Sequence, residues 1–436
     1  MAEIDGIDVP DSLRECPDCG QMHRVPPVLP RRGVVQCLRC DGVLRRSRAN
    51  PLTRPLALAV AGLMLLAAAL ISPMLTMNFY GLERQAAMLT GARVLDAQGT
   101  WALGALVFLT IAILPALRLG ALALVLGGLR LPRPPPGMRL VFRLYERIAP
   151  WAMVEVFLIG VMIAYSQAAS YGRVDAGTAL YLLGALVLVM VMLDAALDAE
   201  AVWQALARAR PFAPALPRAS AESPVLIACR ACRLVSVASA DGRDRCPRCG
   251  HRLRRRKSNS LARAWALITA ATILYIPANV FPVMTLVYLG RGVPHTILGG
   301  VEELIQKRLW PLAAIVFLAS ITVPLLKLVS LAVMMLNVHF GWTGLLRDRT
   351  RLYRIVSAIG RWSMIDVFVL SALAALVRMG FLASVHAQVG AIAFAAVVIL
   401  TMLASESFDP RLMWDAAAAR RRRTGRRRAL PPEHVR

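Results

Sequence analysis

Apolar stretches long enough to cross a membrane occupy most of the chain beyond residue 50. A helix needs about 20 mostly apolar residues to span the hydrocarbon core of a bilayer, so we predict eight transmembrane helices. Two stretches exceed one crossing, and we expect their far ends to continue as helices beyond the bilayer or to lie at its surface. The predicted spans are 56–82, 97–129, 148–172, 176–193, 264–290, 309–346, 362–381 and 387–405.

The pattern of the first four spans returns in the last four. Its most distinctive segment, Trp151-Ala-Met-Val-Glu-Val-Phe157, reappears as Trp362-Ser-Met-Ile-Asp-Val-Phe368. Because four is an even number, both halves enter the membrane from the same side, and we predict parallel repeats related by an axis along the membrane normal. Matched residues differ by 209 positions early in the repeat (Pro73 and Pro282, Trp101 and Trp310, Pro115 and Pro324, Arg118 and Lys327) and by 211 later (Trp151 and Trp362, Glu155 and Asp366, Phe157 and Phe368, Trp203 and Trp414).

The composition agrees with a membrane protein, since 57% of the residues are hydrophobic and the mean hydropathy is +0.57. The formal net charge of +25 comes from 51 Lys and Arg against 26 Asp and Glu. Such an excess is also typical of nucleic-acid-binding proteins. Here the arginines lie between apolar spans, as the positive-inside rule requires, so we expect no nucleic acid partner.

The loops between spans alternate between strongly basic and nearly balanced. The basic ones are 44–55, 130–147, 252–257 and 347–361, and the tail after residue 415 is also basic. Cytoplasmic loops carry the excess of Lys and Arg, so we predict that both termini are cytoplasmic and that four loops face outward. The first 14 residues lack the apolar core of a signal peptide. The basic tail, 416–436, is expected to anchor the topology or to contact anionic lipid.

All eight cysteines fall into two polar segments, 1–50 and 222–257, one before each half. Each segment holds two Cys-x-x-Cys pairs, separated by 17 residues in the first and by 13 in the second. This spacing is typical of structural zinc sites, with iron as an alternative metal. Disulfides or redox-active pairs remain alternatives, although a cytoplasmic location disfavours disulfides. The predicted ligands are Cys16, Cys19, Cys37, Cys40, Cys229, Cys232, Cys246 and Cys249.

Few charged residues lie at membrane depth, and each is a functional hypothesis because its burial there is costly. They are Glu155, Asp366, Arg118, Lys327 and Arg378. An acid and a base of the same half could pair across the helices and line a cleft. Alternatively, the pairs only hold helices together, or the long cations extend to the membrane surface.

The fifth span contains two prolines five residues apart, Pro277 and Pro282, with Asn279 between them. Prolines leave backbone carbonyls without partners and can break a transmembrane helix. We predict an unwound segment in which Asn279 lines a cavity, with a simple packing kink as the alternative. The chain has no hydrolase triad, phosphate loop or haem ligand set, so we expect no enzymatic activity.

The paired cysteine segments, the four-plus-four spans and the Trp-x-Met-x-(Glu/Asp)-Val-Phe repeats together resemble the paraquat-inducible protein A family, over roughly residues 14–415. The resemblance implies a bacterial inner-membrane protein with zinc-ribbon-like cysteine segments. It also implies a periplasmic partner built from MCE (mammalian cell entry) domains, which forms a tunnel for lipid. The family member would pass lipid into that tunnel or receive lipid from it.

These expectations define an all-α integral membrane protein that moves phospholipid between the inner membrane and the MCE partner. The phospholipid headgroup is expected near Asp366, Asn279 and Lys327, and a proton step at Asp366 or Glu155 is one hypothesis for the drive. A redox protein that uses its cysteine pairs, and a passive anchor for the partner, are the alternatives. The expected units are a zinc-ribbon-like module (1–50), a four-helix repeat (51–210), a second module (222–257), a second four-helix repeat (258–415) and the basic tail (416–436).

Overall fold

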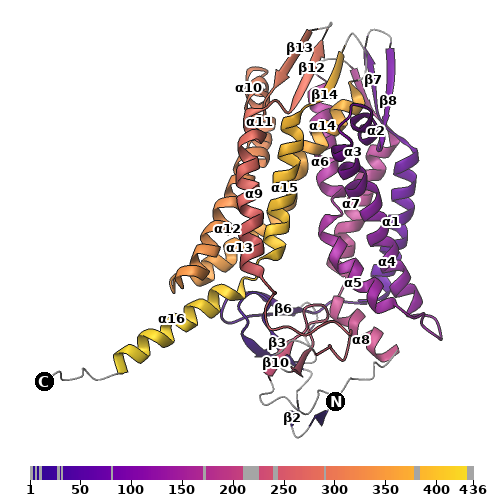
Figure 1. The fold of residues 1–436 in the computed structure, drawn as a ribbon. Coiled ribbons are helices and arrows are strands. Elements are labelled where there is room, and N and C mark those ends of the chain that lie inside the picture. Colours follow the sequence, from indigo (N-terminus) through magenta and orange to yellow (C-terminus); the bar gives the residue numbers. More distant parts are fainter. Residues whose placement is uncertain are drawn as a thin grey trace, which may run out of the picture.

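The protein is a multi-pass membrane protein, and among its described residues eight helical segments are long and apolar enough to span a membrane. They form two groups that stand side by side (Figure 1). We call the end that carries the cysteine segments the module end, and the opposite end, with β7 and β12, the sheet end. The computed structural model describes residues 3–4, 7–8, 12–26, 30, 33–79, 82–169, 173–209, 225–238, 244–288, 291–377 and 383–429.

The two halves repeat the same order of elements. In the first half these are α1 (Thr53–Ile71), β7 (Pro73–Phe79), β8 (Leu82–Ala87), α2 (Thr90–Ala97), α3 (Trp101–Phe108), η1 (Leu109–Ile113), α4 (Leu114–Gly128), α5 (Met138–Ile148), η2 (Ala149–Trp151), α6 (Val154–Ala168), β9 (Arg173–Ala176), α7 (Thr178–Ala196) and α8 (Ala199–Ala209). In the second half they are α9 (Ser260–Val280), β12 (Met284–Tyr288), β13 (Arg291–His295), α10 (Ile297–Gln306), α11 (Trp310–Phe317), η3 (Leu318–Thr322), α12 (Val323–Phe340), α13 (Leu346–Ile359), η4 (Gly360–Met364), α14 (Ile365–Leu376), β14 (Ala383–Ala387), α15 (Val389–Ser407) and α16 (Arg411–Ala429).

Strand register confirms the repeat at the level of single residues. The first sheet has the order β8-β7-β9 and the second β13-β12-β14. Leu75 pairs with Ala176 in the first, and Met284 pairs with Ala387 in the second. These are the positions that the offsets of 209 and 211 relate. The predicted parallel repeat is therefore confirmed, although neither three-stranded sheet was expected.

The sheets correct the predicted first and fifth spans, which were taken as helical to residues 82 and 290. The helices end earlier, at Ile71 and Val280, and strands follow. The cause is a proline, because the residue before a proline is driven out of the helical region. Ser72 and Phe281, which precede Pro73 and Pro282, are both extended, with ψ values of 152° and 150°.

Prolines also explain a wide π-helical turn in the middle of the second and sixth spans. η1 and η3 end two residues before Pro115 and Pro324. A proline in a helix interior has no N–H for the usual bond and crowds the preceding turn. The N–H groups of the residues just before the prolines, Leu114 and Val323, donate to the carbonyls five residues back. π turns of this kind are frequent at functional sites.

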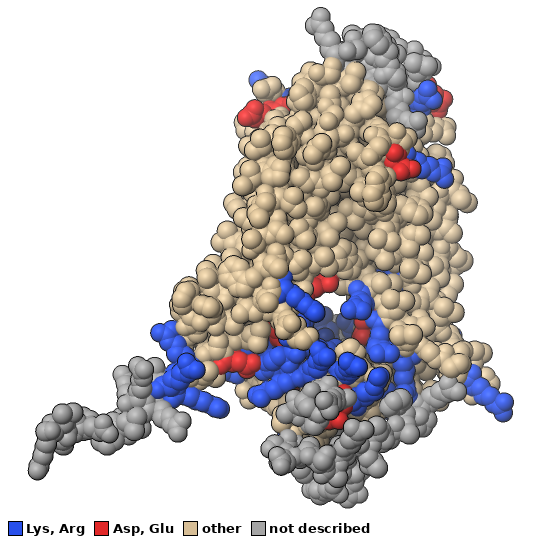
Figure 2. All heavy atoms as spheres, viewed as in Figure 1, with Lys and Arg blue, Asp and Glu red and all other residues tan. Residues whose placement is uncertain are grey.

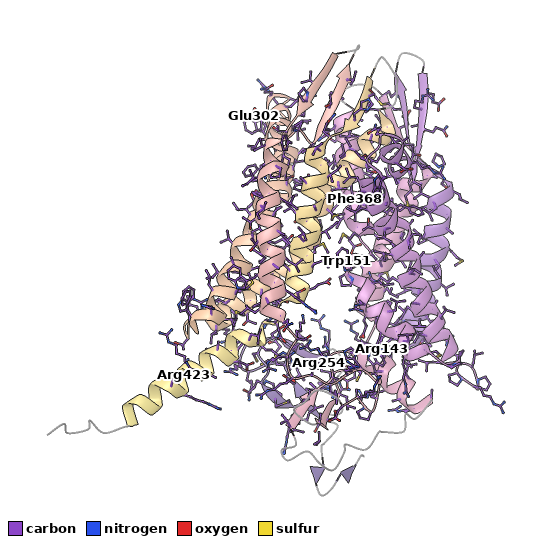
Figure 3. The ribbon with its side chains drawn as sticks, viewed as in Figure 1. Arg143, Trp151, Arg254, Glu302, Phe368 and Arg423 are labelled. Carbon is purple, nitrogen blue, oxygen red and sulfur yellow. The ribbon has the colours of Figure 1, made fainter. Side chains whose placement is uncertain are left out.

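The two halves meet where α6 crosses α14. The matched residues Phe157 and Phe368 contact each other edge to face, with ring centroids 5.6 Å apart, and Phe368 lies between the two groups in Figure 3. Gly160 allows this approach, because a Cβ at Gly160 would lie 2.8 Å from the Cβ of Phe368. Small residues bring membrane helices together in the same way elsewhere.

The cysteine segments lie at the module end, where Lys and Arg also gather (Figure 2). The first module contacts the second repeat, which it does not precede. Arg354 of α13 donates to Asp18 at 2.7 Å and to the Cys40 carbonyl oxygen at 2.5 Å. The Arg39 guanidinium lies over the Trp414 ring of α16, 4.3 Å from its centroid. The module strands are β1 (Glu3–Ile4), β2 (Ile7–Asp8), β3 (Leu13–Glu15), β4 (Met22–Arg24), β5 (Val34–Gln36) and β6 (Val43–Arg46) in the first, and β10 (Val225–Ala228) and β11 (Val235–Ala238) in the second.

The buried cysteines of the second module share one apolar cluster with Trp203 and Leu206 of the first repeat, so the two modules dock crosswise. Cys249 and Leu206 of α8 border one surface pocket. Asp409, just before α16, joins both modules, because it accepts bonds from Arg411 at 2.9 and 3.0 Å and from Arg230 of the second module at 3.4 Å. Arg411 also donates to Glu15 of the first module at 3.0 Å.

Candidate functional site

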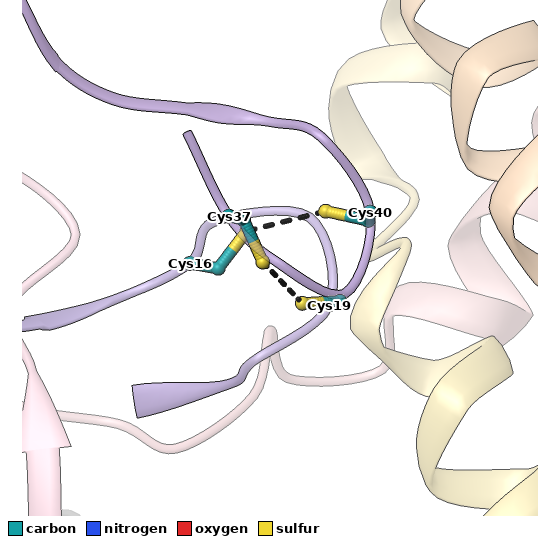
Figure 4. A group of neighbouring side chains, drawn as sticks. All are labelled: Cys16, Cys19, Cys37 and Cys40. Carbon is teal, nitrogen blue, oxygen red and sulfur yellow. Dashed lines mark hydrogen bonds between the residues drawn. The ribbon is translucent and has the colours of Figure 1, made fainter. Parts of the chain in front are cut away.

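The four cysteines of each module form a compact buried cluster. Within each cluster all four Sγ atoms lie within 4.8 Å of one another. In the first module the Sγ atoms of Cys16 and Cys40, and of Cys19 and Cys37, are 3.5 Å apart (Figure 4). All eight cysteines are free, so the disulfide alternative is wrong for this structure. Four sulfurs at this spacing match a tetrahedral metal site, in which a Zn–S bond is about 2.3 Å long.

The backbone around each Cys-x-x-Cys pair explains how the sulfurs converge. The residue after each second cysteine has a positive φ: 73° at Gly20, 59° at Asp41, 58° at Arg233 and 72° at Gly250. Its N–H donates to the carbonyl of the first cysteine of the pair at 2.8–2.9 Å. Only glycine adopts this left-handed conformation without strain. Asp41 and Arg233 therefore adopt it at an energetic cost, and the turn around the cysteine cluster requires this conformation.

The first cluster has an additional polar contact. The His23 Nε2 atom lies 3.1 Å from Cys37 Sγ, and the Arg39 N–H donates to the same sulfur at 3.4 Å. Donors to a coordinating sulfur orient it and stabilise its negative charge. The two clusters can therefore each hold one metal ion through four sulfurs.

A pocket opens at the sheet end of the second repeat. Its walls are mainly apolar and come from α14 on one side and from β12, α10 and α11 on the other. Two first-repeat residues, Met77 and Gln167, complete it. The apolar lining includes Val369, Leu370, Leu373, Val377, Val283, Leu286, Ile297, Leu304 and Val316.

Polar groups at the inner end of this pocket come from α14 and the π turn η3. Asp366 and Ser320 both line the pocket, and the Ser320 hydroxyl lies beside the Asp366 carboxylate. The same hydroxyl lies 2.6 Å from the Val316 carbonyl oxygen. The Asp366 Oδ2 atom has no hydrogen-bond partner among the described residues. A carboxylate in this position is expensive unless a ligand or a proton compensates its charge.

A second polar group lies on the α10 side of the pocket. Glu303 pairs with Lys307 at 2.7 Å and with His295 at 3.6 Å, and all three residues line the pocket. The pocket is therefore amphipathic, with apolar walls between the Asp366 and Glu303 groups. Binding sites combine a mostly apolar lining with a few placed polar groups in this way.

Of the residues predicted to form a cleft, Asp366 is the one found in this pocket. Its first-repeat counterpart Glu155, in the first turn of α6, does not line it. Lys327 is buried, with 1% of its surface exposed, and does not extend to the membrane surface. Its Nζ atom donates to the Gly360 carbonyl and to Thr401 Oγ1, each at 3.1 Å. These bonds hold α12 against η4 and α15.

Arg118, the counterpart of Lys327, is also buried but forms an ion pair with Asp194 at the end of α7. Its guanidinium lies 5.9 Å from the Tyr145 ring centroid. The expected partner, Glu155, is not the one observed in this ion pair. Asp194 was not considered as a partner of Arg118 because it lies one residue beyond the predicted end of the fourth span.

The predicted unwound segment is absent, because α9 continues through Pro277 to Val280. Pro277 lies only one turn before the helix end, so its missing N–H costs a single bond. Asn279 donates to the Tyr275 carbonyl at 2.8 Å within the helix and does not line the pocket, whereas Val283, directly after Pro282, does. Arg378 lies outside the described residues.

Sequence reasoning missed several residues of the polar groups. Ser320, Thr401 and Asp194 are single polar residues in or beside apolar runs, and the position of Ser320 four residues before Pro324 was the available signal. His295 and Lys307 gave no signal, because the fold brings them to the pocket through β13 and α10.

Comparison with known proteins shows the family to which the sequence belongs. A family model described as Paraquat-inducible protein A matches residues 52–207 and 261–418. The chain is 33% identical over 404 residues to Lipophilic envelope-spanning tunnel protein A of Escherichia coli (strain K12), covering 92% of this chain and 91% of the relative. It is 33% identical over 407 residues to Intermembrane transport protein PqiA of the same strain, covering 92% and 95%.

A more distant relative, Probable intermembrane transport protein of Haemophilus influenzae (strain ATCC 51907 / DSM 11121 / KW20 / Rd), is 26% identical over 410 residues, covering 93% of this chain and 96% of its own. No solved structure matches the chain.

Proposed function

Because the chain belongs to the paraquat-inducible protein A family, we propose that it moves phospholipid between the bacterial inner membrane and a periplasmic MCE-domain partner. The relatives are named for intermembrane transport and for an envelope-spanning tunnel. The observation that carries the proposal is the amphipathic pocket at the sheet end of the second repeat. Its apolar walls suit acyl chains, and its polar groups suit a headgroup.

The proposed orientation puts the module end in the cytoplasm and the sheet end in the periplasm. The basic loops before and after the spans support it, because they carry the arginines that the positive-inside rule expects on the cytoplasmic side. In this orientation the pocket lies toward the periplasm, where the MCE partner would receive or deliver lipid.

We propose that the cysteine clusters hold zinc as a structural metal. Four buried cysteine sulfurs in each cluster form a closed ligand set, which is typical of structural rather than catalytic zinc. A closed set leaves no open position for a substrate, which argues against hydrolytic work at the modules.

Asp366 is the proposed centre of the transport step. The Ser320 hydroxyl has one proton and two acceptors in reach, Asp366 and the Val316 carbonyl. An ionised Asp366 requires that proton, whereas a protonated Asp366 can donate its own and release the hydroxyl to Val316. Protonation thus exchanges hydrogen bonds inside the pocket and removes a charge from it, which favours the entry of acyl chains.

The test measures lipid transfer from proteoliposomes that contain the full chain to the soluble MCE partner. Asp366→Asn is expected to lower the transfer rate at least tenfold (an order-of-magnitude expectation for loss of a buried charged group). Glu155→Gln is the matched control, because it occupies the same position of the first repeat but lies outside the pocket. Equal rates for Asp366→Asn and the unaltered protein would rule out the proposed step, and equal losses for both variants would rule out its assignment to the pocket.

A further inference from the structure

A second opening lies at the module end, between the two repeats. Figure 2 shows it as a gap bordered by Lys and Arg side chains. It is formed where α5 and η2 of the first repeat approach the ends of α9 and α15 of the second, with part of the second module below. We call it the vestibule. Its charged and aromatic lining consists of Arg147, Trp151, Arg230, Lys257, Arg263 and Glu406.

The vestibule carries more positive charge than its own acid can balance. Four cations and one carboxylate line it, and Arg230 also pairs with Asp409 behind the lining, which leaves a formal excess of two positive charges. Glu406 itself lies beside Trp151. Uncompensated like charges that converge on one opening repel each other, so an anionic occupant would stabilise this arrangement.

The cations differ in how they are held. Lys257 donates to the carbonyls of Glu406 and Phe408, and Arg230 shares Asp409 with Arg411. Arg147 and Arg263 are exposed and have no hydrogen bond or ion pair among the described residues. Two cations are thus fixed by the protein, and two remain available to an incoming anion.

The position of the vestibule indicates what the anion is attached to. α15 ends at Ser407 and α9 begins at Ser260 beside it, so the opening lies at the level where spans leave the membrane. Ile148 and Leu403 add apolar surface to the lining, and Trp151 is the residue type enriched at this depth. A soluble anion would not require an apolar border.

We propose that the vestibule is a binding site for the phosphate group of an anionic phospholipid in the leaflet at the module end. Arg147 and Arg263 contact the phosphate, Arg230 and Lys257 supply fixed positive charge behind it, and Ile148, Trp151 and Leu403 contact the glycerol and the first acyl carbons. The site is separate from the sheet-end pocket and requires no transport. It therefore goes beyond the proposed function.

The experiment uses the full chain in lipid nanodiscs and measures its preference for spin-labelled phosphatidylglycerol over spin-labelled phosphatidylcholine by electron paramagnetic resonance. The double variant Arg147→Gln/Arg263→Gln should reduce that preference by about fivefold for each cation removed. Arg147→Lys/Arg263→Lys keeps both charges and should retain most of the preference. The matched control is Arg130→Gln/Arg133→Gln, which removes two exposed arginines after α4, outside the vestibule.

Three outcomes would overturn the proposal. An unchanged preference in the Arg147→Gln/Arg263→Gln variant would show that the vestibule does not bind the headgroup. An equal loss in the control would show that diffuse surface charge causes the preference. Binding of inorganic phosphate at the vestibule without any lipid preference would assign the site to a soluble anion. The lipid preference is measured without the MCE partner and the transfer rate with it, so failure here and failure of the transport proposal are distinguishable.

Discussion

Gly160 offers a direct test of how the two repeats are joined. Alanine there would place its Cβ 2.8 Å from the Cβ of Phe368 and 3.3 Å from the backbone of residues 368 and 369. The first distance is shorter than real Cβ contacts allow, so α6 and α14 must separate. Overpacking of this kind costs about 1–3 kcal/mol, whereas alanine in place of glycine favours a helix by about 1 kcal/mol.

The control for this substitution is Gly184→Ala in α7, because a Cβ at Gly184 meets no atom within 4 Å. The Gly184→Ala variant should be more stable than the unaltered protein, because only the helix propensity of the residue changes. Gly160→Ala should therefore be less stable than Gly184→Ala by about 1–3 kcal/mol, seen as a lower midpoint of thermal unfolding in detergent by tryptophan fluorescence. A midpoint for Gly160→Ala equal to or above that of the control would refute the close crossing at this glycine.

Three further predictions concern the module end and the pocket wall. Burial opposes ionisation of Asp409, but its hydrogen bonds to Arg411 outweigh burial and hold the pKa of Asp409 below its ordinary value. The stabilisation of the fold by these bonds is complete above about pH 4 and is lost as pH falls. Asp409→Asn should therefore flatten the dependence of the thermal midpoint on pH below 4. Elemental analysis should find two zinc ions per chain and one in Cys16→Ser; two ions in the variant would contradict the ligand assignment. Amide exchange should be faster in α10 and α11 than in α14, because a small separate cluster of Val301, Leu304 and Ala313 holds the former. Equal rates would contradict the weaker packing of this pocket wall.

The sequence predicted the features that depend on local pattern. Apolar length gave the spans, offsets gave the repeat, and Cys-x-x-Cys spacing gave both clusters. The offsets also matched Glu155 with Asp366, but they could not distinguish the two acids. That difference arises from η3, where Ser320 stands opposite Asp366, whereas the offset of 209 pairs Ser320 with Ile111 in the first repeat.

The partners of the buried cations depended on packing and could not be predicted. Lys327 and Arg118 occupy matched positions, yet one bonds to a carbonyl and a threonine and the other to a carboxylate. Thr401 and Asp194 belong to the matched helices α15 and α7, but they occupy different turns of those helices. Both halves therefore bury a cation at this position, and each half provides different residues as its hydrogen-bond or ion-pair partners.

The crosswise docking of the modules gives part of the excess positive charge a structural role. The positive-inside rule accounts for arginines at the module end by topology alone. In the structure, Arg354 holds Asp18 of the first module, and Arg347 and Arg351 hold Asp41. Both acids belong to the Cys-x-x-Cys turns, because Asp18 lies within the first pair and Asp41 directly follows the second. The arginines of α13 thus attach a module that precedes the other repeat, and each module ties the two repeats together at the end opposite the pocket.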